Sequence, residues 1–256
     1  MPTPPAGPGF IGIGAQKAAT TWLFKWLSAH PEIGFAPLSK RPGPTIADGK
    51  PAATWPKEVH FLTGPNQDRG WDWYLDLFRT EGRSERLLGD ITPRYLTASQ
   101  EEISALRRRC PDVRLLLNLR DPVERDWSAI RMLARRRELL DQPAALVTLA
   151  GDPGILKKGD LRRTVSAWLE IFPREQFFIS ALPDIEARPQ QVIRAIAAFL
   201  GADPAFYSRP EIAARLQEPV HRGPDAEMPP ELEALLRDRH RDTYQVLDAI
   251  RPDSAL

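Results

Sequence analysis

Near the N-terminus, a lysine and two threonines lie between a glycine-rich apolar segment and an apolar segment typical of a helix. Residues 10–23 read FIGIGAQKAATTWL, with Lys17, Thr20 and Thr21 in the middle. If a strand ends at Gly14 and a helix begins near Thr20, the backbone N–H groups of the first helical turn point at the loop between them. Lys17 adds a cation there and the threonines add hydroxyl donors, so the stretch favours an anion site. The alternative is an ordinary strand-to-helix turn with a surface lysine.

Two familiar nucleotide-binding loops do not fit this stretch. The Walker A pattern requires a glycine just before the lysine and a serine or threonine just after it, and Gln16 and Ala18 occupy those positions. The dinucleotide fingerprint requires a glycine at the position of Lys17, where the helix packs closely on the strand. The stretch therefore predicts an anion site that neither pattern describes.

A second candidate anion site follows the most apolar segment of the chain. Residues 113–128 read VRLLLNLRDPVERDWS, which places Arg120 at the end of a predicted strand and Ser128 in the helix after it. The arginine fork suits a phosphate, and the serine hydroxyl adds a second donor. The alternative is a structural ion pair of Arg120 with Asp121 or Glu124. Two anion sites on neighbouring strands would suit a ligand with two separate phosphates.

The rest of the chain must supply the elements that position these sites. Apolar runs and amphipathic spacing predict strands at 10–14, 33–35, 87–91, 113–119 and 176–180, and helices at 20–30, 71–78, 99–109, 123–137, 161–172, 189–200 and 228–250. Residues 141–160 are interpreted as loop-rich, and the chain is looser after Pro204. The alternation predicts an α/β fold, a single domain over residues 1–256 with a central parallel sheet flanked by helices. Ligands of such sheets bind at the carboxyl ends of the strands.

Composition narrows the possible classes of function. The chain has 256 residues, a net charge of +1 and a single cysteine, Cys110. The small net charge argues against nucleic acid as a partner, and one cysteine allows no internal disulfide. Apolar runs are far shorter than the roughly 18 residues that cross a bilayer, so no integral membrane segment is expected. No cluster of histidine, cysteine and carboxylate side chains has the spacing of metal ligands, so no metal is expected.

Two segments are predicted to lie outside the regular elements. Residues 1–8 form a proline-rich, extended lead-in without the basic and apolar regions of a signal peptide, so a cytoplasmic location is expected. Residues 37–56 are rich in proline and glycine. Structureless loops longer than about 12–15 residues are often lids or binding loops. We expect an insertion loop or lid at 37–56, with a disordered segment as the alternative.

Together, these motifs resemble those of sulfotransferases that use 3′-phosphoadenosine 5′-phosphosulfate (PAPS). GAQKAATTWL resembles their 5′-phosphosulfate loop, and RDPVERDWS resembles their 3′-phosphate motif, an arginine at a strand end followed by a serine. KEVHFL (57–62) is similar to a stretch of the heparan-sulfate-type and related bacterial members. TPRYL (92–96) and AWLEIFPREQFFIS (167–180) match further units. The likeness covers residues 10–200 and implies a P-loop-NTPase-like sulfotransferase fold.

The resemblance implies a role for each residue of the donor site. Lys17 would neutralise charge on the oxygen that bridges sulfate and 5′-phosphate, and Arg120 and Ser128 would hold the 3′-phosphate. Trp22 corresponds to a position that stacks on the adenine in some members. The 5′-phosphate would be held by Gln16, Lys17, Ala18, Ala19, Thr20 and Thr21, and a basic loop would close over the nucleotide at His221, Arg222 and Gly223.

The resemblance also implies residues for the acceptor. Glu58 matches the catalytic glutamate of heparan-type members, and His60 is the rival base, since other members use a histidine. For His60, the favoured alternative is a histidine packed in a strand. Asp90 would either contact the acceptor or cap the turn after strand 87–91, and Arg94 in that turn would contact the acceptor.

These inferences predict an enzyme that transfers the sulfuryl group of PAPS to a hydroxyl acceptor by in-line displacement, with Glu58 as general base. The acceptor would be a small-molecule, lipid or glycan alcohol. Ile91 stands where heparan-type members have a lysine, which argues against a sulfated polysaccharide, and the basic runs 107–109 and 135–137 are expected on solvated helix faces. The alternatives are a protein that binds PAPS or its product PAP without transfer, and a P-loop-like kinase, which Ala18 disfavours.

Overall fold

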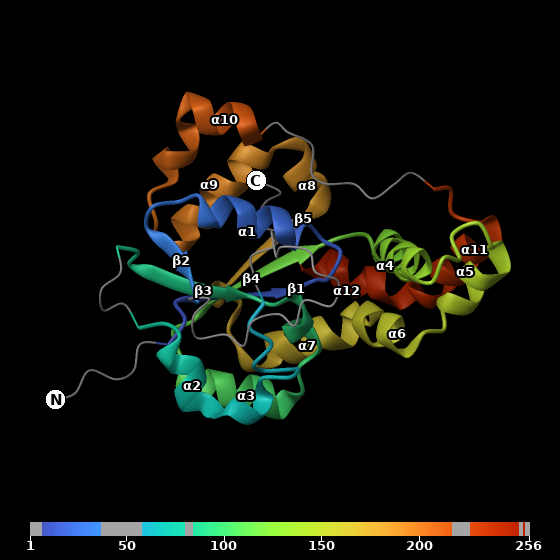
Figure 1. Cartoon of the computed structure of the whole chain (residues 1–256), viewed down its shortest axis with the longest axis horizontal. Helices are drawn as coiled ribbons and strands as arrows, with labels where there is room; N and C mark the ends of the chain where they lie inside the picture. The colour runs from blue at the N-terminus through green and yellow to red at the C-terminus, as the bar shows by residue number, and fades with distance from the viewer. Residues whose placement is uncertain (1–6, 37–57, 80–83, 217–225, 251–252, 254–256) are drawn as a thin grey trace.

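A five-stranded parallel sheet forms the centre of the protein, in the strand order β2-β3-β1-β4-β5 (Figure 1). The computed structural model describes residues 7–36, 58–79, 84–216, 226–250 and 253. The strands are β1 (Phe10–Gly14), β2 (Ile33–Phe35), β3 (Leu87–Ile91), β4 (Arg114–Leu119) and β5 (Phe177–Ala181). The predicted α/β fold with a central parallel sheet is therefore confirmed. The predicted lid at 37–56 lies outside the described residues.

The strand register brings the two predicted anion sites together. In the central strand β1, Ile11 lies between Asp90 of β3 and Leu115 of β4. Strands β1 and β4 are buried along nearly their whole length, as expected for central strands covered on both faces. The loop after β1, the turn after β3 and the segment after β4 therefore leave the sheet side by side at its carboxyl edge.

Helices cover both faces of the sheet. One face carries α1 (Thr20–Ser28), α8 (Leu182–Ala187), α9 (Pro189–Leu200) and α10 (Pro210–Leu216), and the other carries α2 (Gly70–Asp76), α3 (Gln100–Arg109) and α7 (Leu161–Ile171) (Figure 1). Trp26 and Ile196 pack with Phe10 in the first layer, and Leu106 and Trp168 pack with Ile11 in the second. Burial of these apolar side chains stabilises the sheet between its two layers.

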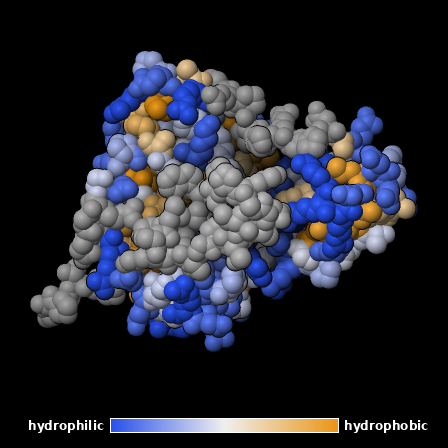
Figure 2. All heavy atoms as spheres, viewed as in Figure 1, coloured by the Kyte–Doolittle hydropathy of each residue, from blue (hydrophilic) through white to orange (hydrophobic). Residues whose placement is uncertain are grey.

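A separate helical lobe lies beyond the carboxyl ends of the strands (Figure 1). It consists of α4 (Pro122–Arg136), α5 (Pro143–Leu149), α6 (Pro153–Gly159) and α11 (Pro230–Arg239), and α12 (Arg241–Ala249) leads from it back to α7 of the second layer. Ile130, Leu149 and Leu236 belong to its core. Figure 2 shows apolar surface on this lobe beside strongly hydrophilic side chains. No helix in the described ranges is long and apolar enough to cross a membrane.

The lobe contains the main differences from the predicted elements. Residues 141–160 were expected to be loop-rich, but Pro143 and Pro153 each begin a short helix, because proline suits the first helical position. The predicted helix 228–250 is two helices, α11 and α12, which meet at the buried His240. After Pro204, the chain forms a 3-10 turn and then α10.

Candidate active site

The loop between β1 and α1 contains two residues with left-handed backbone conformation. Lys17 has a φ of 73° and Ala19 a φ of 58°. Ala19 is the N-cap of α1, and its side chain makes no capping hydrogen bond to the first turn. The N-terminus of α1 at Thr20 therefore suits an anion. Gly14, with a φ of 153°, precedes the loop, and a Cβ there would lie 3.0 Å from the Cβ of Leu96. Glycine therefore allows the turn after β3 to pack against the loop.

A buried asparagine holds this loop against the sheet. The Asn118 side-chain nitrogen donates to the Ala18 carbonyl oxygen at 3.0 Å, and its side-chain oxygen accepts from the Ser180 hydroxyl at 2.9 Å. The Ala15 N–H donates to the Asn118 carbonyl oxygen at 2.8 Å. Asn118 and Ser180 are paired in the register of β4 and β5. Neither residue was among those predicted for the site, although each is the polar residue of an otherwise apolar strand core.

The Lys17 amine points toward α4, into a cluster of positive charge. Its Nζ lies 3.8 Å from the Met132 sulfur. Burial lowers the pKa of Lys17, and the charges that lower it further come from four arginines, Arg120, Arg131, Arg135 and Arg125. Like charges around a half-buried amine are unfavourable in the absence of an anion. This arrangement therefore favours a multiply charged anionic ligand.

Arg120 lies where sequence analysis placed it and joins the two predicted anion sites. Its Nη1 donates to the Lys17 carbonyl oxygen at 3.3 Å, and its Nη2 lies 3.1 Å from the Glu124 carboxylate. The ion pair that was the structural alternative is thus present. The Arg120 side chain is still 19% exposed, and a guanidinium has five donors, so this pair does not preclude a ligand.

One face of α4 carries further residues of the positive cluster around Lys17. Ser128, Arg131 and Arg135 recur at helical spacing, and Met132, which contacts Lys17, lies between them. Ser128 is half-buried, as a residue at the rim of a site would be. Arg131 was missed, and Arg135 was expected on a solvated face. Arg135 is indeed exposed, but its charge reaches Lys17. Their spacing of three and seven residues from Ser128 was the available signal.

The segment that contains the two candidate bases, residues 58–61, packs against the turn after β3. The Glu58 Oε2 and the His60 Nε2 are 3.2 Å apart, and the two side chains are 31% and 33% exposed. His60 has a φ of 53° and lies outside the strands, so the expectation of a histidine packed in a strand is wrong. The Val59 N–H donates to the Thr92 hydroxyl at 2.9 Å, and the Phe61 N–H to the Tyr95 hydroxyl at 2.8 Å. Both candidate bases therefore share one anchored segment.

Asp90 supports that segment from inside the protein. Asp90 is 0% exposed, and its carboxylate accepts from the Thr92 hydroxyl at 2.8 Å and from the Val59 N–H at 3.4 Å. Because the carboxylate has no exposed surface and bonds within the turn, the structure favours the second expectation for Asp90, a cap of the turn after strand 87–91, over a contact with the acceptor. Arg94, in the 3-10 turn Pro93–Thr97, is exposed. Burial lowers the pKa of Lys158 on α6, and the charge of Arg94 lowers it further, so the two cations lie near each other.

The remaining predicted donor-site residues fall into three groups. Gln16 is half-buried and Thr21 exposed, whereas Ala18 and Thr20 are buried. Trp22 is 7% exposed and packs in the core of the first helical layer, which leaves almost no ring surface for an adenine. The predicted stacking role of Trp22 is therefore not supported. His221, Arg222 and Gly223 lie outside the described residues.

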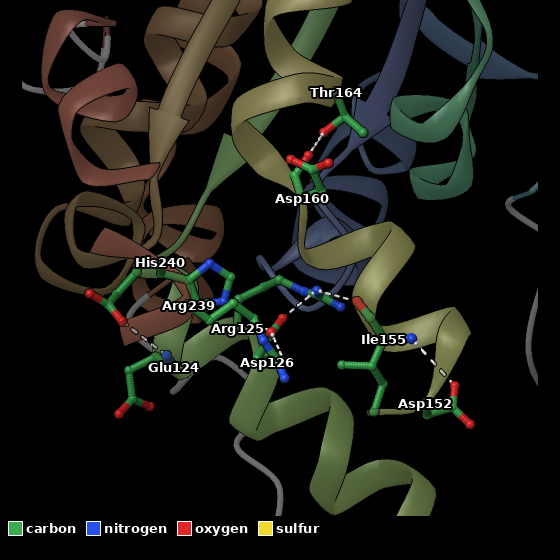
Figure 3. Close-up of polar contacts among 10 residues, drawn as sticks. Glu124, Arg125, Asp126, Asp152, Ile155, Asp160, Thr164, Arg239 and His240 are labelled. Atoms are coloured by element: carbon green, nitrogen blue, oxygen red, sulfur yellow. Dashed lines mark hydrogen bonds and ion pairs between the residues drawn. The ribbon is translucent and has the colours of Figure 1, made fainter. Parts of the chain in front are cut away.

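A buried ion network holds α4 in place beside the cluster (Figure 3). The Asp126 carboxylate lies 2.6 Å from Arg125 Nη1, 3.0 Å from His240 Nε2 and 3.5 Å from Arg239 Nη1. Arg125 and Asp126 are 0% exposed. A Cβ at Gly159 would lie 2.6 Å from Asp126, so a glycine is needed where α6 approaches α4. The network joins α4 to α6 and to the C-terminal helices.

Comparison with known proteins gives concordant matches. A model described as "Sulfotransferase family" matches residues 8–205. The mouse "Bifunctional heparan sulfate N-deacetylase/N-sulfotransferase 4" is 27% identical over 216 residues. That match covers 78% of this chain but 23% of the mouse protein, so the chain spans about a quarter of the length of this relative.

Two solved structures share the fold. A sulfotransferase from Alicyclobacillus acidocaldarius is 26% identical and has a TM-score of 0.64, with 96% of both chains covered. Sulfotransferase STF9 from Mycobacterium avium is 15% identical and has a TM-score of 0.60, over 95% of this chain and 77% of that one.

Proposed function

This chain belongs to the sulfotransferase family, and on that premise we propose that it transfers the sulfuryl group of PAPS to an acceptor hydroxyl, with PAP as the second product. One observation carries the proposal. The Lys17 amine lies at the carboxyl edge of the sheet, and the charges that lower its pKa all belong to arginines. Such a cluster suits a ligand with several negative charges, as PAPS has.

The residues present fit both charged ends of PAPS. The left-handed loop at Lys17 and Ala19 and the start of α1 suit the 5′-phosphosulfate, because they direct backbone N–H groups toward an anion. Arg120 at the end of β4 and Ser128 on α4 suit the 3′-phosphate. The Arg120–Lys17 hydrogen bond supports one continuous site for both groups.

The proposed chemistry requires charge stabilisation and removal of one proton. Bound PAPS supplies an activated sulfuryl group with a phosphate leaving group. A bond forms between the acceptor oxygen and the sulfur as the bond from the sulfur to the bridging oxygen breaks. Lys17 stabilises the negative charge that develops on the bridging oxygen, and the Glu58 carboxylate takes the hydroxyl proton.

Glu58 is proposed as the base, and His60 as its neighbour in the site. The 3.2 Å contact between His60 Nε2 and Glu58 Oε2 supports this pairing, because an N–H at that ring nitrogen would donate to the carboxylate and orient it. His60 is the alternative base. Arg94 is retained as an acceptor contact because it is exposed in the turn next to this pair.

The acceptor class is proposed more broadly than the donor. Small-molecule, lipid and glycan alcohols are all compatible with a hydroxyl acceptor. The name of the mouse relative specifies N-sulfation of heparan sulfate, so glycans with a free amine belong in the same acceptor panel.

The first test measures donor binding. PAP should raise the melting temperature of the protein far more than ATP does, because ATP lacks a 3′-phosphate. Equal shifts with PAP and ATP would point to a general nucleotide site, as in the kinase alternative.

The second test measures transfer. Sulfur-labelled PAPS is incubated with a panel of alcohols and amino glycans, with wild type and Glu58→Gln compared. We expect labelled product with wild type only, and unchanged PAP binding in Glu58→Gln. Full activity of Glu58→Gln would move the base to His60, and PAP binding without any transfer would favour the binding-protein alternative.

A further inference from the structure

The buried Thr92 contacts two different segments, one through its backbone and one through its hydroxyl. Its backbone N–H donates to the Gly12 carbonyl oxygen of β1 at 3.0 Å. Its hydroxyl oxygen accepts from the Val59 N–H at 2.9 Å and lies 3.5 Å from the His60 N–H. Thr92 is 0% exposed. The residue therefore ties the segment with Glu58 and His60 to the strand that leads into the Lys17 loop.

The hydroxyl of Thr92 is held in a single orientation. It donates to the Asp90 carboxylate at 2.8 Å, which directs its lone pairs at the 59–60 backbone. A hydroxyl has one donor and two acceptor sites, and these three contacts match that number, with the Tyr95 hydroxyl as a further partner of the Asp90–Thr92 pair. The Tyr74 hydroxyl lies 3.4 Å from the same carboxylate. Because these groups are buried, the hydrogen bonds are strong and loss of one partner is costly.

The held segment includes a backbone conformation that needs support. His60 has a φ of 53°, and such conformations persist only where the surroundings impose them. Asn66 donates from its side chain to the Val59 carbonyl at 2.7 Å and from its backbone to the His60 carbonyl at 3.3 Å. The Tyr95 hydroxyl accepts from the Phe61 N–H at 2.8 Å. Thr92 and Tyr95 thus bind alternate N–H groups of one short segment.

We propose that Thr92, assisted by Tyr95, is a positioning residue for the transfer reaction: its hydroxyl sets the place of the Glu58–His60 pair relative to Lys17. The inference rests on the proposed function, because the position of Glu58 matters only if that pair handles the acceptor proton. Thr92 touches neither donor nor acceptor. Its effect is on geometry, where a displacement of about 1 Å can reduce a rate by about 100-fold.

The test compares two substitutions at one position. Thr92→Val keeps the shape and removes the hydroxyl, whereas Thr92→Ser keeps the hydroxyl. We expect Thr92→Val to lower kcat by about 10- to 100-fold with KM for PAPS and Kd for PAP unchanged, and Thr92→Ser to restore most of kcat. Thr164→Val is the matched control, since Thr164 on α7 is also buried but its hydroxyl donates to the carbonyl oxygen of Asp160, the N-cap of that helix. It should lower stability only.

A second readout does not depend on the acceptor. The NMR signals of the His60 ring should shift in Thr92→Val and return in Thr92→Ser, and they should not change in Thr164→Val. Tyr95→Phe gives an independent variant of the same anchor if Thr92→Val does not fold. It should shift the His60 signals and lower kcat without weakening PAP binding.

The outcomes separate the positioning role of Thr92 from the proposed sulfuryl transfer. Unchanged kcat and unchanged His60 signals in Thr92→Val, or in Tyr95→Phe if Thr92→Val does not fold, overturn the positioning role. A loss of kcat that Thr92→Ser does not restore, or that comes with weaker PAP binding, also overturns it. Absence of transfer by the wild type contradicts the proposed function instead, while the His60 signals still report whether Thr92 holds the segment.

Discussion

The guanidinium of Arg120 donates a hydrogen bond to the backbone carbonyl oxygen of Lys17 at 3.3 Å. The two residues are distant in sequence, but β1 and β4 are neighbours in a parallel sheet, so both leave it at the same edge. The contact joins the Arg120 side chain to the loop that contains Lys17. A change at Arg120 should therefore affect both the 3′-phosphate contact and the loop.

We expect Arg120→Ala to weaken PAP binding by about 10- to 100-fold, the usual range for a lost hydrogen bond to a charged group. Binding of adenosine 5′-phosphosulfate, which lacks the 3′-phosphate, should weaken much less. Titration calorimetry with both ligands measures the difference. Arg108→Ala removes the same charge from an exposed position on α3 and serves as the control. Equal losses for the two ligands would contradict a 3′-phosphate contact.

Lys17 should take up a proton when PAP binds at alkaline pH. Its pKa in the protein is lowered from 10.5 by burial and by the arginines, and a bound anion favours the charged amine and raises that pKa again. Between the lowered pKa and 10.5, the unfolded chain holds more protons than the folded one, so Lys17 makes stability rise with pH in that window.

Calorimetry of PAP binding in two buffers with different ionisation enthalpies measures this proton uptake. It should disappear in Lys17→Met and persist in Lys25→Met, because Lys25 is an exposed lysine later in α1. PAP affinity should fall as the pH rises through the pKa of bound Lys17. Affinity independent of alkaline pH would remove Lys17 from the site.

Asn118→Leu should loosen the loop from the sheet. The substitution removes the donor to the Ala18 carbonyl and leaves the Ser180 hydroxyl unpaired. We expect a loss of about 1–3 kcal/mol in the free energy of unfolding and weaker PAP binding. Urea unfolding and calorimetry measure the two effects. Ser180→Ala keeps the Asn118–Ala18 hydrogen bond, so it should bind PAP like wild type; wild-type PAP affinity in Asn118→Leu would show that Asn118 does not hold the loop.

Asp126→Asn should destabilise the lobe strongly. The change keeps the shape but leaves Arg125 buried without its carboxylate partner. Breaking a buried pair in this way costs about 3–5 kcal/mol. The control, Asp242→Asn, removes an exposed pair with Arg162 and should cost at most about 1 kcal/mol. Similar urea midpoints for the two variants would mean that the buried network contributes little.

The sequence by itself determined the five strands, the main helices that alternate with them, and the two anion motifs. Strands 10–14, 33–35 and 87–91 match their predicted bounds, because apolar runs this short, with glycine or proline close by, favour a strand over a helix. Lys17 and Arg120 were found because each stands at the end of such a run, where a parallel sheet places its ligands.

Only the tertiary structure decided which way several side chains point. Asp90 and Trp22 are buried, burial and then the charges of arginines including Arg131 and Arg135 lower the pKa of Lys17, and the buried His240 stands between two helices and contacts Asp126. The physical reason is common to all of them: local spacing predicts a helix or strand, but exposure depends on neighbours distant in sequence. A polar residue beside a turn is thus a ligand contact or a structural support according to packing that no short motif contains.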